Sequence, residues 1–170
     1  NGKTVGIIGL GNTGTAFAKL LKGFDVKILA LDIYKKGFET DQIKAASLQQ
    51  IQQEAHIISL HLPLTALTLH YANETFFGAC KQQPYFISTC RGSVTETGAV
   101  LKALQNQWVR GVGRDVLENE QFANYSPSEK QQLEAILAFP NAIITPHIAG
   151  YSHEAYYKMA RIVLEKLSII

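Results

Sequence analysis

Side chains that suit proton transfer and anion binding stand just after short apolar stretches of this sequence. The guanidinium of Arg91 follows the stretch 85–89, and the imidazole of His147 follows the stretch 142–145. Histidine exchanges protons near neutral pH, and the two-pronged guanidinium matches a carboxylate. The stretch 109–116 and the residues after it add acids that would orient such a histidine and stabilise its charged form: Asp115, Glu118 and Glu120.

Together these groups suit the oxidation of a 2-hydroxy acid by a nicotinamide cofactor, in which the carbon loses a hydride and the hydroxyl group loses a proton. His147 would accept that proton, and Arg91 would bind the carboxylate and polarise the carbonyl in the reverse direction. Each residue taken alone has a plainer interpretation. His147 can be an ordinary loop residue, Arg91 can neutralise a helix end, and the acids can belong to a solvated loop.

Other reactive side chains are weaker candidates for catalysis. Cys90 stands next to Arg91, but no base that would activate its thiol is identifiable nearby in the sequence. His61 follows the apolar stretch 57–60, and we expect it to position neighbouring groups. The remaining histidines lack such a placement, and we predict structural or surface roles for them: His56, His70 and His153.

A glycine-rich turn indicates where a cofactor would bind. Residues 7–14 read IIGLGNTG and fit the pattern G-x-G-x-x-G through Gly9, Gly11 and Gly14. An apolar run precedes them and helical spacing follows, which is the context that this pattern needs to bind a pyrophosphate at a helix N-terminus. Gly9 would permit the tight turn, Gly11 would let the backbone approach the phosphates, and Gly14 would let the helix pack close to the sheet.

An acid at the end of the next apolar stretch favours one nicotinamide cofactor over the other. Asp32 stands 18 positions after Gly14 and would accept hydrogen bonds from the ribose hydroxyls of adenosine. Its charge would repel a 2′-phosphate, so we expect NAD rather than NADP, although Lys35 and Lys36 follow closely and temper that preference. The plainer interpretation is a glycine turn followed by a turn-forming aspartate.

The elements that must position these residues alternate along the chain. Strand-like stretches lie at 3–8, 26–31, 57–60, 85–89, 109–116 and 142–145, and helical spacing occurs at 15–22, at 47–54, after 97, at 128–138 and at 154–167. This alternation predicts a doubly wound parallel sheet covered by helices on both faces, an α/β fold of the Rossmann type. In the helix at 15–22 we expect one inward face: Ala16, Phe17, Leu20 and Leu21.

The composition is typical of one globular domain and argues against a nucleic-acid-binding protein or a membrane-spanning one. The chain has 170 residues, of which 46% are hydrophobic and 18% charged, and a formal net charge of +2. It has no basic stripe that would favour nucleic acid and no apolar run long enough for a membrane helix. We expect a cytoplasmic location, with Cys80 and Cys90 as free thiols. The chain opens at Asn1, without a start methionine, directly into a strand, so we interpret residues 1–170 as a single excised domain.

Several motifs in a fixed order carry a resemblance to a known family. They are VGIIGLGNTG, LD at 31–32, SLHLPLT at 59–65, STCRGSV at 88–94, GRDVLENE at 113–120 and TPHIAG at 145–150. Along essentially its whole length the chain resembles the NAD-binding domain of the D-isomer-specific 2-hydroxyacid dehydrogenase family. The resemblance implies an NAD-dependent enzyme acting on a 2-hydroxy or 2-keto acid, with D-3-phosphoglycerate dehydrogenase as the best single guess.

The resemblance also assigns roles to individual residues. It implies that Arg91 binds the substrate, that His147 is the general acid and base, and that Glu120 orients His147. Asp115 would contact the nicotinamide carboxamide, and Pro63 and Thr68 would line the nicotinamide ribose. The cofactor-binding set implied by the motifs is completed by Asn12, Thr13 and Cys90.

The family's architecture adds two expectations. Its nucleotide domain lies between two segments of a substrate domain, so this piece alone should turn over poorly or not at all. Family members commonly dimerise through this domain, so we also expect a homodimer.

Departures from the family pattern favour a second hypothesis. Arg114 replaces an apolar residue beside the nicotinamide pocket, and Gln121 replaces a proline after Glu120. The chain could therefore be a non-catalytic NAD-sensing module, like the corepressors built on the same domain. A third hypothesis, another kind of Rossmann enzyme, would leave Arg91, Glu120 and His147 without a common purpose.

Overall fold

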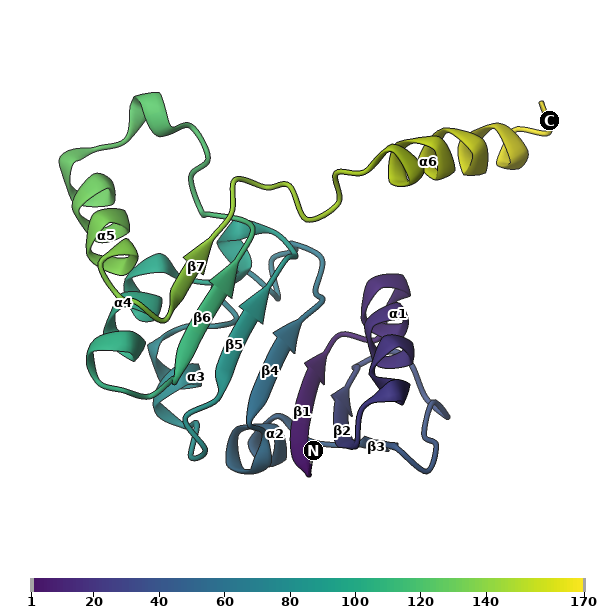
Figure 1. Ribbon diagram of the computed structural model, residues 1–170, viewed down its shortest axis with the longest axis horizontal. Helices are drawn as coiled ribbons and strands as arrows, with labels where there is room; N and C mark the ends of the chain where they lie inside the picture. The colour runs from purple at the N-terminus through teal and green to yellow at the C-terminus, as the bar shows by residue number, and fades with distance from the viewer. Residues whose placement is uncertain (1, 170) are drawn as a thin grey trace.

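The computed structural model of the protein describes residues 2–169. Within that range the chain forms a parallel sheet of seven strands in the order β3-β2-β1-β4-β5-β6-β7 (Figure 1). The order turns back at β1 and β4, as in a doubly wound fold. The predicted Rossmann-type architecture is confirmed. The strands are β1 (Lys3–Ile8), β2 (Val26–Leu31), β3 (Ile43–Ala45), β4 (Ile57–Leu60), β5 (Tyr85–Ser88), β6 (Gly111–Arg114) and β7 (Ala142–Ile144).

Helices connect the strands, and four of the α-helices in residues 2–169 begin at a residue whose side chain caps them. The Ser47 hydroxyl accepts a hydrogen bond from the Gln50 amide at the start of α2, and Ser126 and Glu129 form a reciprocal capping box on α5. The α-helices are α1 (Asn12–Leu20), α2 (Leu48–Glu54), α3 (Glu74–Gly78), α4 (Thr97–Gln105), α5 (Pro127–Leu137) and α6 (His153–Lys166). Short 3-10 turns lie at η1 (Leu21–Gly23), η2 (Gly92–Val94) and η3 (Phe122–Asn124).

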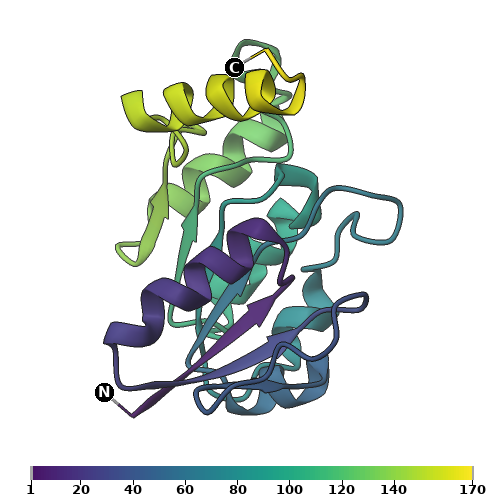
Figure 2. The same cartoon turned by 90° about the vertical axis from the view of Figure 1, so that its right-hand side faces the viewer.

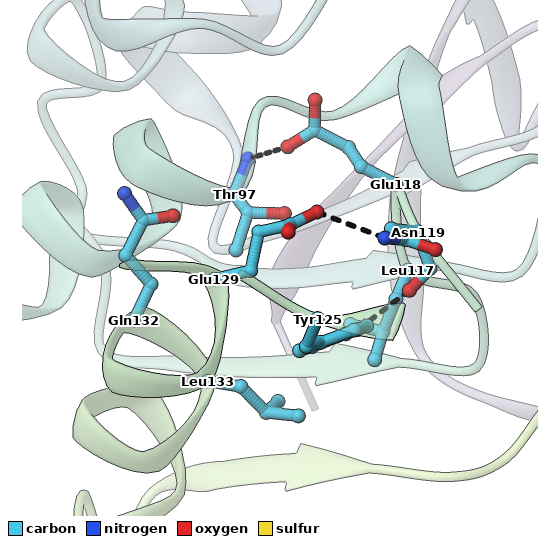
Figure 3. A pocket seen from close by; sticks show the side chains of 8 residues that line it. All are labelled: Thr97, Leu117, Glu118, Asn119, Tyr125, Glu129, Gln132 and Leu133. Carbon is cyan, nitrogen blue, oxygen red and sulfur yellow. Dashed lines mark hydrogen bonds between the residues drawn. The ribbon is translucent and has the colours of Figure 1, made fainter. Parts of the chain in front are cut away.

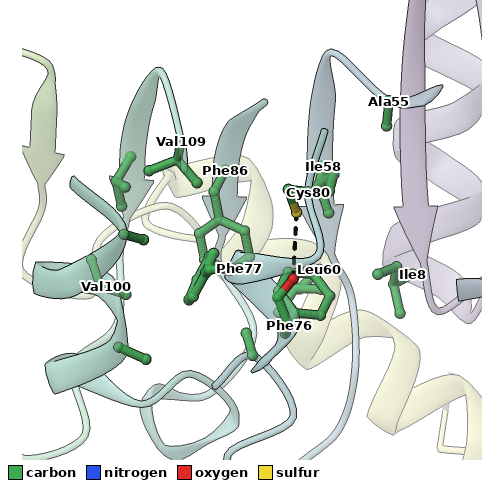
Figure 4. Close-up of a cluster of buried hydrophobic side chains, with 14 of the residues drawn as sticks. Ile8, Ala55, Ile58, Leu60, Phe76, Phe77, Cys80, Phe86, Val100 and Val109 are labelled. Atoms are coloured by element: carbon green, nitrogen blue, oxygen red, sulfur yellow. Dashed lines mark hydrogen bonds between the residues drawn. The ribbon is translucent and has the colours of Figure 1, made fainter. Parts of the chain in front are cut away.

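The larger core lies between one face of the sheet and helices α2 to α5. Alternate residues of β4, β5 and β6 point into it, and aromatic rings fill its centre (Figure 4). The rings of Phe77 and Phe86 meet edge to face, with centroids 4.9 Å apart. Burial of this apolar surface provides the main stabilisation of the fold.

Helix α1 covers the other face, but only over β1 and β2 (Figures 1 and 2). Farther along this face, Ile87 and Ile143 flank Gly113 in register and are 36% and 67% exposed. The prediction that helices cover both faces therefore holds only in part within residues 2–169.

Helix α1 also turns a different face inward from the one that we predicted. Leu20 is 74% exposed, and α1 buries Gly14 and Ala18 instead. These small residues stand four positions apart and let the helix axis approach the sheet closely. The larger side chains of Phe17 and Leu21 therefore pack only at the margin of the cluster.

Two short elements have no counterpart in the sequence prediction. Strand β3 has three residues and lies at the edge of the sheet, so it shows no apolar run. Helix α3 has five residues, too few to display a helical period. The predicted strand 109–116 is shorter in the structure, where β6 ends at Arg114.

Helix α6 lies apart from the sheet at the end of an extended segment (Figure 1). None of its residues, His153–Lys166, is buried, and several large apolar side chains on it are exposed. In residues 2–169, the helices are all too short or too polar to cross a membrane.

Candidate active site

The glycine turn brings the N-terminus of α1 close to the edge of the sheet. Gly9 has a φ of +94°, and a Cβ there would lie 2.5 Å from the His61 carbonyl oxygen. A Cβ on Gly14 would overlap the Gly9 carbonyl oxygen. Gly11 begins α1 without a side-chain cap, and a Cβ on it would meet no atom within 4 Å. The backbone N–H groups of Asn12 and Thr13, the first of α1, can therefore bind a pyrophosphate.

Asp32 is held against this turn by backbone donors. Its Oδ2 accepts a hydrogen bond from the Leu10 amide at 2.7 Å, and its Oδ1 accepts from the amides of Tyr34 and Lys35 at 2.9 and 2.8 Å. Burial opposes the charged form, but these three donors outweigh it and lower the pKa of Asp32. An open cavity of about 550 Å³ lies beside Asp32 and offers room for an adenosine.

Lys35 occupies a place that the sequence does not reveal. Its Nζ donates to the Leu10 carbonyl at 3.2 Å and to the Thr15 hydroxyl at 3.0 Å. The ammonium therefore lies over the glycine turn, near the uncapped start of α1. Lys35 therefore supplies a cation beside the glycine turn.

Arg91, Glu120 and His147 line one cavity of about 340 Å³ at the carboxyl ends of the strands. They come from the segments that follow β5, β6 and β7. Nδ1 of His147 lies 2.9 Å from one carboxylate oxygen of Glu120 and 3.1 Å from the other. The structure thus gathers the predicted cation, acid and imidazole, and Gln121 does not prevent Glu120 from reaching His147.

The backbone of His147 is held in a conformation that is uncommon for a residue other than glycine. Its φ is +56°, and its amide donates to the carbonyls of Asp115 and Thr145 at 2.8 and 3.0 Å. Such a conformation persists where surrounding contacts impose it, often at functional positions. Here those contacts fix the imidazole beside Glu120.

Asp115 supports the loop that carries His147. Its Oδ1 accepts from the Thr145 hydroxyl at 2.6 Å and the Ile148 amide at 2.9 Å, and its Oδ2 accepts from the Ala149 amide at 2.9 Å. Burial opposes the charge, but these donors outweigh it and lower the pKa of Asp115. The sequence analysis missed this role. The contact of Asp115 with the nicotinamide carboxamide stays a prediction.

Arg91 stands beyond the end of its strand rather than at the tip. Strand β5 ends at Ser88, and Arg91 begins the turn η2 with an exposed side chain whose Nη1 donates to the Cys90 carbonyl at 2.7 Å. The Cys90 thiol is buried, 3.2 Å from the Ser88 hydroxyl. Any contact of Cys90 with the cofactor would therefore come from its backbone.

The loop after β4 is braced from within. The Thr68 hydroxyl donates to the Pro63 carbonyl at 2.6 Å, which joins the two residues predicted to line the nicotinamide ribose. The His61 ring packs against Phe17 and lies 3.0 Å from the Ser59 hydroxyl, and burial lowers the pKa of His61. These contacts agree with a positioning role for His61.

A second histidine–glutamate pair lies beside the cavity. Nε2 of His70 is 2.7 Å from Oε1 of Glu118. The other Glu118 oxygen accepts a hydrogen bond from the Thr97 amide (Figure 3). Glu118 thus bonds to the start of α4 and to His70 rather than to His147. Across residues 2–169, no cluster of three or more histidine, cysteine, aspartate or glutamate side chains could hold a metal ion.

Comparison with known proteins identifies the family that the chain resembles. Residues 1–149 match the family model of the D-isomer specific 2-hydroxyacid dehydrogenase, NAD binding domain. Over 169 residues the chain is 38% identical to a glyoxylate reductase of Thermofilum pendens. The match covers 98% of this chain and 48% of the relative.

Solved structures show the same likeness. The NAD-complexed D-isomer specific 2-hydroxyacid dehydrogenase of Lactobacillus delbrueckii ssp. bulgaricus matches with a TM-score of 0.87 at 31% identity, over 98% of this chain and 53% of that one. The D-lactate dehydrogenase of Aquifex aeolicus, complexed with NAD and lactic acid, matches with a TM-score of 0.87 at 29% identity. That match covers 98% of this chain and 52% of that one.

The chain spans about half the length of the curated relatives that it matches. The family match covers most of the chain, and the resemblance inferred from the motifs is confirmed. The chain therefore belongs to the D-isomer-specific 2-hydroxyacid dehydrogenase family and carries that family's NAD-binding domain.

Proposed function

We propose that the protein containing this chain is an oxidoreductase that transfers a hydride between NAD and a D-2-hydroxy acid or 2-keto acid. The observation that carries the proposal is the pairing of His147 with Glu120 across one cavity from Arg91. A base, the acid that orients it and a cation for a carboxylate meet where an open α/β sheet binds its ligands.

The side chains divide the work of the reaction between them. NAD, when bound, supplies the hydride acceptor. The Arg91 guanidinium binds the substrate's carboxylate in two-point geometry. His147 takes the hydroxyl proton on Nε2 during oxidation and returns it during reduction. Glu120, bonded to Nδ1, keeps the ring oriented and stabilises the imidazolium that forms.

Residues of the glycine turn fit the cofactor that this reaction requires. The free N–H groups at the start of α1 would bind the pyrophosphate, and Asp32 would bind the adenosine ribose. Asn12 and Thr13 would act through their backbone amides. Asp115, Pro63 and Thr68 would border the nicotinamide end.

The substrate we favour is a small 2-keto acid. The relatives described above are named for glyoxylate and for D-lactate. The narrower prediction from sequence was a D-3-phosphoglycerate dehydrogenase, and it stays a prediction. A substrate panel should therefore hold glyoxylate, pyruvate and a branched 2-keto acid beside the keto form of 3-phosphoglycerate.

The proposal is tested by measuring NADH oxidation by the intact protein in the presence of each keto acid of that panel. We expect absorbance at the nicotinamide band to fall with at least one keto acid, and His147→Gln to lower kcat by about 10²-fold or more while NADH still binds. NADH binding without turnover of any keto acid would contradict the proposal. That result would favour the alternative, a non-catalytic NAD-sensing module.

The positions of Arg114 and Glu120 bear on the two departures from the family pattern, Arg114 and Gln121, that motivate the sensor alternative. Arg114 points into the helix layer rather than the nicotinamide pocket, and Glu120 reaches His147 despite Gln121. Neither departure disturbs the predicted catalytic set, which supports the enzyme over the sensor.

We also propose a homodimer and a cytoplasmic location. Exposed apolar side chains on α6, and Ile87 and Ile143 on the sheet, provide surface for a second copy. Cys80 and Cys90 are both buried free thiols, as expected in a reducing compartment. Cell fractionation tests the location, and sedimentation tests the dimer.

A further inference from the structure

Arg114 places a guanidinium in the interior of the domain. It is 2% exposed and is the largest fully buried side chain among residues 2–169. Side chains alternate along β6, so Arg114 points to the same face as Val112, into the layer of α4, while Asp115 points toward β7. Burying a charge costs free energy unless polar partners compensate for the lost water.

The partners of Arg114 all lie on the segment that follows Arg91. Nη2 donates to the carbonyls of Gly92 and Thr95, each at 3.3 Å, and Nη1 donates to the Thr97 hydroxyl at 3.4 Å. Nε has no partner among the described residues, so the two terminal nitrogens alone hold the guanidinium. The carbonyls of Gly92 and Thr95 belong to η2 and to the residue that ends it.

A negative charge on the neighbouring loop balances this cation. The Glu118 carboxylate accepts a hydrogen bond from the Thr97 amide at the start of α4 (Figure 3). It also pairs with His70. Burial lowers the pKa of Arg114 to about 10, and the charge of Glu118 opposes that shift, so Arg114 remains charged at neutral pH. A cation alone near a helix N-terminus would be unfavourable, and Glu118 relieves that cost.

The same segment is also clamped from its other side. A Cβ on Gly92 would overlap the backbone of Leu117, so η2 lies in direct contact with the loop that carries Glu118 and Glu120. The His70 amide donates to the Ser93 carbonyl at 2.8 Å. The turn that carries Arg91 is thus fixed by the loops after β4 and β6, with Arg114 beneath it.

We propose that Arg114 is a positioning residue that holds the Arg91 turn, residues 91–97, in the geometry that binds the substrate's carboxylate. Arg114 touches neither substrate nor cofactor and acts through the carbonyls of Gly92 and Thr95. This inference rests on the proposed function in so far as Arg91 binds substrate. The rigidity of the turn can be measured without any turnover.

The first test is hydrogen exchange at the amides of Val94 and Thr95, which donate to Arg91 and Gly92 within the turn. In the intact protein, Arg114→Met should speed their exchange by about tenfold or more, because charge-assisted hydrogen bonds to the turn are lost. Arg114→Lys keeps the charge with fewer donors and should give an intermediate rate. The matched control is Arg110→Met, since Arg110 is exposed just before β6.

The second test separates substrate binding from cofactor binding. Arg114→Met should raise KM for the keto acid by about tenfold and leave the Kd of NADH within about twofold, because a small displacement of Arg91 weakens only carboxylate binding. If Arg114→Met does not fold, Arg114→Lys decides the matter with the same two measurements.

The outcomes distinguish this inference from the function on which it rests. Unchanged exchange at Val94 and Thr95 in both Arg114 variants would overturn it, as would equal losses of keto-acid and NADH binding. If the wild-type protein reduced no keto acid, the proposed function would fail, while hydrogen exchange would still decide whether Arg114 holds the turn.

Discussion

Nδ1 of His147 lies 2.9 Å from a carboxylate oxygen of Glu120, although 27 positions separate the two residues in the chain. Each follows a strand, and β6 and β7 are neighbours in the sheet. The pairing therefore arises from topology. Because it engages Nδ1, we expect Nε2 of His147 to be the atom that meets a substrate.

Glu120→Gln should lower kcat for keto-acid reduction by about 10- to 100-fold with little change in the Kd of NADH. The amide can still accept a hydrogen bond from Nδ1, but the negative charge that stabilises the imidazolium is gone. Steady-state kinetics and fluorescence titration with NADH measure both quantities. Glu134→Gln, on the exposed side of α5, is the matched control. An unaltered kcat in Glu120→Gln would rule out this role.

Much of this site could be predicted from the sequence because the sheet imposes a simple rule. Strands that read as apolar runs end at one edge, so residues just after them meet there. Arg91, Glu120 and His147 follow that rule. Neither β3 nor α3 could be predicted, since three and five residues are too few to show a period.

Other parts of the site depend on contacts that no local pattern encodes. The pair of His70 and Glu118 joins residues 48 positions apart, and the sequence predicted a surface or structural role for His70. The direction of Arg114 was readable in principle, because it stands two positions after the buried Val112 on one face of β6. The carbonyls of Gly92 and Thr95 that hold it come from another segment, and only the fold shows them.

Asp115→Asn should destabilise the domain at neutral pH by about 1–3 kcal/mol. An amide in this place would set an N–H group against a backbone donor such as that of Ala149. The folded-state pKa of Asp115 lies below its ordinary value of about 3.9. Its contribution to stability is therefore complete above that value and is lost as pH falls through the lower folded-state pKa.

Thermal unfolding of wild type and Asp115→Asn across pH 7 to 3 measures this effect. The difference in Tm should be largest at neutral pH and should shrink at the acid end. A difference that grows as pH falls would show that the charge of Asp115 is not what stabilises the loop.

Gly14→Ala and Gly11→Ala should separate folding from cofactor binding. A Cβ on Gly14 overlaps the Gly9 carbonyl, so Gly14→Ala should lower both Tm and NADH affinity. Gly11 has open space around its Cβ position and an ordinary φ of −64°, so Gly11→Ala should leave Tm nearly unchanged. It should nevertheless weaken NADH binding by about tenfold or more, because the methyl group blocks the approach of the pyrophosphate. Equal Tm losses in the two variants would contradict this distinction.

Acidic substitutions in the apolar stripe of α6 should disrupt the proposed dimer contact. Tyr156, Met159 and Val163 are spaced i, i+3, i+7, lie on one side of the helix, and are 53%, 54% and 55% exposed. A 14-residue helix without packing is marginal in water, so an apolar stripe of this kind is typical of an interface.

The double variant Met159→Asp, Val163→Asp should shift the intact protein from dimer to monomer in sedimentation velocity. Lys158→Glu, which changes charge outside the stripe, should leave the dimer intact. A wild-type protein that sediments as a monomer, or a double variant that stays dimeric, would exclude this face of α6 as the dimer contact.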